Sequence, residues 1–323
     1  MQEYIIAARP DKINRFFVFL RKNPDSAPAG RPYWARGGIR MGIRTDLAVE
    51  AHALWRRSAG ETSTLSGVRA REETERGVPL TFVDILDGEG ERALGKPRGH
   101  YVTVDLTPLR RRVPDAFSAA ADVLAAQLRA LAAPEDGQGV LVVGLGNAAV
   151  TPDAVGPRAL SHLLITRHLV GRLPEAFGAL RPVCAVVPGV LGTTGLESAE
   201  LVRGVIERAR PARVIVIDAL AAMDPERLCS TVQLSDTGIV PGSGVGNARA
   251  AFTRESLGVP TVSIGVPTVI DAAALGAEAA SGLIVTPTDI DEAVGELSRL
   301  VGTAVNLALF EQLSAEEIAF YVG

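Results

Sequence analysis

The sequence predicts an α/β protein with a single main domain, in which a mostly parallel sheet carries helices on both faces. Two observations support this prediction. Continuous apolar runs alternate with stretches of helical spacing, and no linker follows residue 45 in the 323-residue chain. Strands that are buried on both faces are apolar throughout, and regular alternation of strands and helices is typical of parallel sheets.

The individual elements follow from apolar spacing. Short apolar or alternating runs predict strands over 80–86, 100–106, 140–143, 183–187, 214–217 and 260–264. Helical spacing predicts helices over 47–57, 117–132, 197–208 and 289–313, the last with a break near Gly302. Thr151 and Pro152 open a further helix, because Thr is a good N-cap and Pro suits the first helical position.

Composition excludes several classes of protein. Apolar residues make up 47% of the chain and charged residues 22%, which excludes a mainly disordered or collagen-like protein. Aromatic residues make up only 5%, which argues against a nucleic-acid surface built on base stacking. No apolar run approaches the length of a membrane span, so we expect a soluble, cytoplasmic protein. Cys184 and Cys229 form no C-x-x-C motif and are predicted to be core thiols.

Charge divides the chain into two parts. Residues 1–44 carry nine basic and three acidic residues, whereas the whole chain has a net charge of −4. We therefore expect residues 1–46 to form a basic extension or propeptide, with Met41 as an alternative start, and residues 47–323 to form the main domain. The acidic balance of that domain argues against binding to a phosphate backbone.

Two aspartates are candidates for chemistry. Asp153 falls in the first turn of the helix that Thr151 opens, and Asp218 ends the apolar run 214–217. Both are therefore predicted at the carboxyl edge of the sheet, where open α/β folds bind their ligands. Two carboxylates at neighbouring strand ends could activate one water or hold one metal ion. Each taken alone is equally well explained as an acid that stabilises a helix or a turn.

Two glycine-rich loops offer weaker signals. Residues 144–149 match the relaxed dinucleotide pattern G-x-G-x-x-A, but the predicted helix starts too late and the next strand lacks the acid that binds a ribose. Residues 241–247 could hold a substrate carbonyl or an oxyanion through backbone N–H groups, or could simply be a tight connection. The candidates in this second loop are Gly242, Ser243, Gly244, Gly246 and Asn247.

Histidine-dependent hydrolysis is not supported. The sequence lacks a G-x-S-x-G motif, and no histidine follows His168. The loops after the later strands therefore contain no histidine that could act as a base or as a zinc ligand.

Motifs of one known family occur in order along the chain. Two of them are Arg-Thr-Asp-Leu-Ala-Val-Glu at 44–50 and Pro-Gly-Ser-Gly-Val-Gly-Asn at 241–247. The others lie at 95–96 with Tyr101 and Thr103, and at 143–147, 151–154, 156–157, 166–168, 188–190, 216–222, 235–239, 258–260 and 264–268. From about residue 43 to its end, the chain resembles the spore germination protease family, also called the spore endopeptidase.

The resemblance implies an endopeptidase that degrades small acid-soluble, DNA-coating proteins in the spore core during germination. It implies a fold similar to that of the hydrogenase maturation peptidases, and a homotetramer. From the charge and the short apolar runs, we expect no direct contact with nucleic acid or with a membrane. The family's proposed catalytic aspartates fall on Asp153 and Asp218. These are the same two residues that follow the predicted strands at the carboxyl edge of the sheet.

The resemblance also implies a zymogen that cuts its own chain between Asp46 and Leu47. This site is similar to the family's substrate sites, which read acid, large apolar residue, Ala, any residue, Glu. The propeptide would then mask the substrate crevice. Because a buried carboxylate pair responds to pH, mild acidification is the expected trigger.

The sequence departs from the family pattern in two places. The basic stretch before the Arg-Thr-Asp motif is longer than usual, and an insertion that bears on tetramer contacts is reduced to about residues 271–282. We expect no metal cofactor, with a divalent ion at Asp153 and Asp218 as the alternative mechanism. The alternative functions are a maturation peptidase acting on a metalloenzyme precursor and a non-catalytic nucleotide-binding module.

Overall fold

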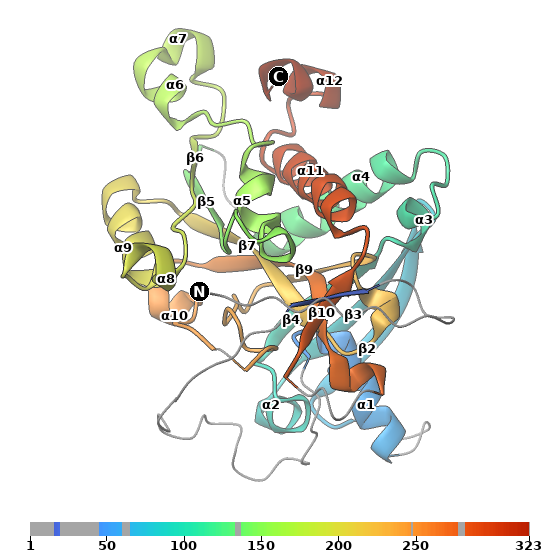
Figure 1. The fold of residues 1–323 in the computed structure, drawn as a ribbon. Coiled ribbons are helices and arrows are strands. Elements are labelled where there is room, and N and C mark those ends of the chain that lie inside the picture. Colours follow the sequence, from blue (N-terminus) through green and yellow to red (C-terminus); the bar gives the residue numbers. More distant parts are fainter. Residues whose placement is uncertain are drawn as a thin grey trace.

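A ten-stranded mixed sheet forms the centre of the computed structural model (Figure 1). The structure describes residues 16–19, 45–59, 65–132, 137–246, 248–276 and 282–322. The order of the main path is β2-β3-β4-β8-β9-β7-β5-β6, and β10 pairs with both β9 and β1.

The strands are β1 (Phe16–Phe19), β2 (Val68–Glu75), β3 (Val78–Ile85), β4 (Gly99–Asp105), β5 (Val140–Gly144), β6 (Val183–Val186), β7 (Arg213–Ala222), β8 (Thr231–Ser235), β9 (Thr261–Asp271) and β10 (Ile284–Pro287). The α-helices are α1 (Ala48–Ala59), α2 (Gly88–Leu94), α3 (Thr107–Arg110), α4 (Ala116–Ala132), α5 (Val155–Leu160), α6 (Arg167–Arg172), α7 (Pro174–Phe177), α8 (Leu191–Thr194), α9 (Ser198–Ala209), α10 (Arg254–Leu257), α11 (Ile290–Leu309) and α12 (Ala315–Val322). Short 3₁₀ turns are η2 (Thr151–Asp153), η3 (Pro225–Arg227) and η4 (Ala272–Leu275).

The sheet has a parallel part and an antiparallel part. Strands β6, β5, β7 and β9 are parallel, whereas β8, β4, β3 and β2 continue the sheet in antiparallel pairs. The chain leaves β5 for β6 on one side and returns to β7 on the other. The strand order therefore reverses between β5 and β7, which is the position where open α/β sheets place a ligand crevice.

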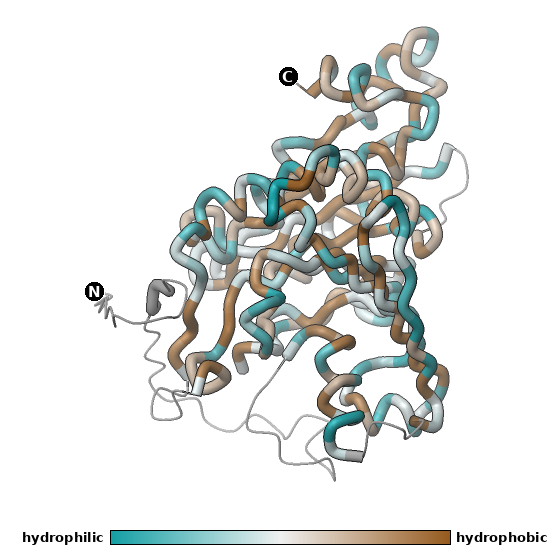
Figure 2. Tube along the Cα trace, turned by 90° about the vertical axis from the view of Figure 1, so that its right-hand side faces the viewer, coloured by the Kyte–Doolittle hydropathy of each residue, from teal (hydrophilic) through white to brown (hydrophobic). Residues whose placement is uncertain are grey.

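Helices cover both faces of the sheet, as predicted. Alternate residues of β5 face opposite sides: Val140 and Val142 join the apolar cluster formed with α4, α5 and α11, whereas Leu141 and Val143 join the cluster formed with α9. Helices α1 and α2 contact each other, and they lie together at the bottom of the view in Figure 1. Apolar and polar stretches alternate along the helices in Figure 2, as expected when one side of each packs on the core.

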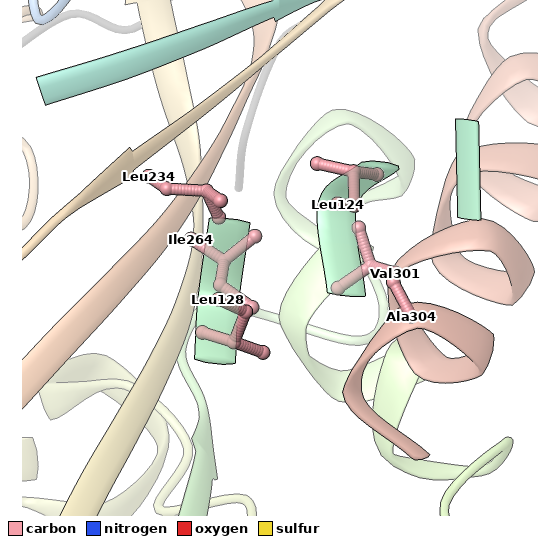
Figure 3. Close-up of a pocket in the computed structure, with 6 residues that line it drawn as sticks. All are labelled: Leu124, Leu128, Leu234, Ile264, Val301 and Ala304. Atoms are coloured by element: carbon pink, nitrogen blue, oxygen red, sulfur yellow. The ribbon is translucent and has the colours of Figure 1, made fainter. Parts of the chain in front are cut away.

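Figure 3 locates a small gap within the larger apolar cluster, between the sheet and two helices. The six side chains that line it are all apolar: Leu124, Leu128, Leu234, Ile264, Val301 and Ala304. It contains no group that could bind a polar substrate, so we regard it as part of the core.

Strands β2, β8 and β10 lie outside the ranges that the sequence predicted, and the following details also differ. Helix α11 runs without a break through Gly302, where a Cβ would lie 2.6 Å from the Cβ of His162, so this glycine permits close packing against the segment after α5. Thr151 and Pro152 open the 3₁₀ turn η2, and α5 begins only at Val155. Within the predicted extension, Phe16–Phe19 pairs with β10; the rest of residues 1–44 lies outside the described residues.

No helix in the described part of the chain is both long enough and apolar enough to cross a membrane.

Gly156 tests the packing that joins β5, β7 and α5. A Cβ at this position would lie 2.3 Å from the backbone oxygen of Leu145 and 2.6 Å from that of Ile217. Gly156→Ala should therefore destabilise the protein by about 1–3 kcal/mol, as overpacking does. In the matched control Gly204→Ala, on the exposed side of α9, the new Cβ meets nothing within 4 Å and should stabilise the protein by up to about 1 kcal/mol. Urea unfolding measures both, and equal midpoints for the two variants would contradict this packing.

Candidate active site

The site begins where β5 stops. Strand β5 ends at Gly144, opposite Ile217, and the amide of Leu145 donates to the Ile217 carbonyl (2.8 Å) before the chain turns away. The loop then packs against η2, which ends at Asp153. The amide of Asn147 donates to Oδ2 of Asp153 (2.9 Å). Gly146 is required here, because a Cβ would lie 1.9 Å from the Asp153 carbonyl oxygen and its φ is +110°. Gly146 of the dinucleotide-like pattern thus allows the close approach of Asp153, whereas Gly144 allows that of Gly156.

Asp218 is the buried member of the predicted pair. Its side chain is 4% exposed, and its Oδ1 accepts the amide of Ala219 (2.9 Å). Burial raises its pKa well above the ordinary value, and the charge of Asp153 raises it further. The Ala219 amide opposes this rise, and the charge of Asp46 adds a smaller upward effect. The structure therefore brings Asp153 and Asp218 into one electrostatically coupled site and adds Asp46 to it.

Beyond Ile217, one edge of β7 has no partner in β5. The peptide segment that begins at Thr45 occupies this edge instead. The amide of Asp46 donates to the Ala221 carbonyl (3.0 Å), and the amide of Ala221 donates to Oδ2 of Asp46 (2.9 Å). Farther along, the amide of Met223 donates to a Glu50 carboxylate oxygen (2.8 Å). Such pairing with an exposed strand edge is a common mode of peptide recognition.

The carboxylate of Asp46 has a second donor. The Ser243 hydroxyl lies 2.6 Å from its Oδ1 and donates to it. Gly244 closes the same pocket, since a Cβ there would lie 2.2 Å from Oδ2 of Asp46 and 2.7 Å from the Cβ of Ala221. The predicted loop 241–247 thus contacts the acidic side chain.

The carbonyl of Asp46 belongs to the bond predicted to be cut, and other donors hold it. Lys96 Nζ lies 2.9 Å from this oxygen and Gln233 Nε2 lies 3.3 Å from it. Lys96 also donates to the Thr45 carbonyl (3.1 Å). Burial lowers the pKa of Lys96, and the charges of Asp46 and Glu50 oppose that effect. Two donors on one carbonyl oxygen are the arrangement that stabilises a developing oxyanion.

Residues after the predicted cut are equally well held. Leu47 is fully buried in an apolar cluster with Leu220, Leu228, Ile270 and Val285 among its members.

Glu50 is anchored on the first backbone groups after β7. It is only 3% exposed, and its two oxygens accept the amides of Met223 (2.8 Å) and Asp224 (2.9 Å). Between these anchors, Ala48 is buried and its amide donates to Oε1 of Gln233 (2.7 Å). The acid, the apolar residue, the Ala and the Glu of the motif therefore each have a defined binding position.

The sequence identified some of these residues and not others. Ser243 and Gly244 contact Asp46, whereas Gly242 and Gly246 take positive φ angles of 73° and 72° that shape the loop. Asn247 lies outside the described residues. Lys96 belongs to the family motif at 95–96, and Gln233 belongs to no motif, so the sequence predicted neither residue as a ligand of Asp46. Neither stands in a local pattern that indicates a ligand.

Metal-binding potential is limited in the described part of the chain. No group of three or more His, Cys, Asp or Glu side chains there is placed to hold a metal ion.

Cys229 is buried, which raises its thiol pKa to about 12, and Cys184 is half-buried.

Comparison with known proteins shows which family the chain belongs to. The profile of the germination protease family matches residues 48–282. A germination protease of Caldanaerobacter subterraneus subsp. tengcongensis is 41% identical over 87% of this chain and 98% of its own length. The germination protease of Clostridium perfringens is 36% identical over 85% of this chain and 98% of its own. That of Priestia megaterium is 44% identical over 72% of this chain and 65% of its own.

Fold, site and relatives together define a hydrolase that cuts peptide bonds within protein substrates. More specifically, the chain belongs to the germination protease family. Nothing in these relationships supports the alternatives of a maturation peptidase or a nucleotide-binding module.

The raised pKa of Asp218 predicts a specific dependence of stability on pH. An acid whose pKa is higher in the folded state binds more protons there, so its contribution to stability falls as pH rises above about 4, the unfolded value, toward the folded pKa. Asp218→Asn removes this effect. The variant and the parent should have similar Tm values near pH 4, and at pH 8 the variant should be higher by at least about 2 °C. A Tm difference that does not change with pH would contradict the assignment.

Proposed function

We propose that this protein degrades small acid-soluble spore proteins during germination, and that it is a zymogen that first cuts its own chain between Asp46 and Leu47. The observation that carries the proposal is the docked segment 45–50: the Asp46 carbonyl accepts two hydrogen bonds at the edge of β7, three residues beyond Asp218. The expected homotetramer and the spore-core location remain predictions that accompany this proposal.

The mechanism uses the two aspartates as an acid and a base. Burial favours the protonated form of Asp218, so the ionised partner is Asp153. Asp153 takes a proton from a water whose oxygen attacks the Asp46 carbonyl carbon. The negative charge that develops on the carbonyl oxygen is stabilised by Lys96 and Gln233. The C–N bond then breaks, and the Leu47 nitrogen leaves as an amine with the proton that Asp218 supplies.

This mechanism predicts that both aspartates are needed in the same reaction. Asp153→Asn and Asp218→Asn should each slow self-cleavage at least about 100-fold, since general acid–base catalysis contributes that much or more. Intact-mass analysis of the full chain, alone and mixed with a small acid-soluble spore protein, measures both reactions. The control is Asp122→Asn on α4, whose carboxylate pairs with Arg76 far from the site. A product that begins at Leu47, formed by parent and control alone, is the expected result. Undiminished cleavage by either site variant would refute the two-aspartate mechanism.

Self-cleavage should also slow as pH rises. An acid loses its proton as pH rises through its pKa, so the active form with protonated Asp218 becomes scarcer in alkaline solution. The rate of product formation, measured from pH 5 to pH 9 by mass, should fall toward the upper end. A rate that is constant or rises over this range would be inconsistent with Asp218 as the acid.

A metal-free reaction is also part of the proposal. Treatment of the full chain with a chelator, followed by its removal, should leave the self-cleavage rate unchanged, because Asp153 activates the water as a base without a metal ion. Loss of activity that one specific divalent metal restores would instead favour the metal mechanism at Asp153 and Asp218.

A further inference from the structure

The pocket around the Asp46 carboxylate consists of few groups, and each contacts the carboxylate closely. Ser243 donates through its hydroxyl to Oδ1, and Ala221 donates through its amide to Oδ2. Both donors are partly or fully removed from solvent. An ionised carboxylate can only accept hydrogen bonds, so two fixed donors suit it better than they suit an apolar or basic side chain.

The nearest cation serves a different part of the segment. Lys96 interacts electrostatically with Asp46, but its ammonium donates to the main-chain carbonyls of Thr45 and Asp46. Every residue type has such a carbonyl, so the hydrogen bonds of Lys96 do not select a side chain, and only its positive charge favours an acid there. The hydroxyl and the amide are the groups that hydrogen-bond to the side chain itself.

Gly244 sets the size of the pocket. A Cβ there would lie 2.2 Å from Oδ2 of Asp46, inside any allowed contact distance. Its φ does not lie in the positive region that favours glycine, so alanine could adopt the same backbone conformation. The glycine is thus required by the carboxylate beside it and also by the Cβ of Ala221, which would lie 2.7 Å from the same position.

We propose that Ser243 is a specificity-determining residue, which together with the Ala221 amide and the space left by Gly244 selects an acidic side chain immediately before the bond to be cut. This inference rests on the proposed function, because it takes segment 45–50 as bound in the manner of a substrate. In this proposal, the loop after β8 selects the substrate side chain, whereas Asp153 and Asp218 perform the chemistry.

Self-cleavage by the full chain provides the first test. Ser243→Ala should slow the appearance of the Leu47 product by about 10-fold to 100-fold, the effect of losing a hydrogen bond to a charged group. Ser243→Thr keeps a hydroxyl and should stay much closer to the parent. The control Ser161→Ala removes a hydroxyl that donates to the Arg158 carbonyl on the surface, and it should cleave at the parent rate.

A stability measurement provides the second test and separates recognition from folding. In the Asp218→Asn background, which keeps the chain intact, Ser243→Ala should lower the Tm when Asp46 is present and leave it unchanged when Asp46→Ala is also present. Ser243→Cys should behave in the same way, because a thiol is only a weak hydrogen-bond donor to the same carboxylate. It serves as the second variant if Ser243→Ala folds poorly.

The outcomes distinguish the two proposals. The proposed role of Ser243 is wrong if the parent cleaves itself and Ser243→Ala cleaves equally fast. It is also wrong if Ser243→Ala lowers the Tm equally with and without the Asp46 carboxylate. In both cases the proposed function stands. If the parent remains intact at every pH tested, the proposed self-cleavage fails, and the substrate-reading role of Ser243 fails with it.

Discussion

The candidate site depends on the unequal length of two neighbouring strands. Strand β5 stops opposite Ile217, whereas β7 continues to Ala222, so the last residues of β7 have backbone groups that β5 cannot pair. Buried backbone donors must find acceptors, and here carboxylates supply them. The alternate amides of Ala219, Ala221 and Met223 donate in turn to Asp218, Asp46 and Glu50. One strand edge thereby positions a candidate catalytic group and two residues of the peptide motif.

This arrangement places several acids in a partly buried region, and its electrostatics follow from that. Burial raises the pKa of Asp218, and the neighbouring charge of Asp153 raises it further. Lys96 supplies a compensating positive charge, and the neighbouring Asp46 and Glu50 oppose the tendency of burial to neutralise it. Removal of the segment before Leu47 would take the Asp46 charge with it. The protonation of the site is therefore coupled to the presence of Asp46 beside it.

The sequence predicted the parallel strands and the two aspartates for a clear physical reason. Apolar runs such as 140–143 and 214–217 are buried on both faces, and the residues that follow them must lie at the carboxyl edge of the sheet. Strand β2 was missed because it is an exposed edge strand rich in charge, with no alternation of apolar residues. Lys96 and Gln233 were missed as ligands because their partner Asp46 is distant in sequence, and only the pairing of the antiparallel strands brings them together.

The central claim is that segment 45–50 is bound along β7 before any bond is cut. Hydrogen exchange at the amides of Met223 and Asp224 tests it most directly, because Glu50 accepts both. In the intact chain, held uncleaved by Asp218→Asn, both amides should exchange slowly. Glu50→Ala should release them while the Val216 amide within β7 stays protected. Exchange of both amides at the rates of an unprotected peptide in the intact chain would contradict the account.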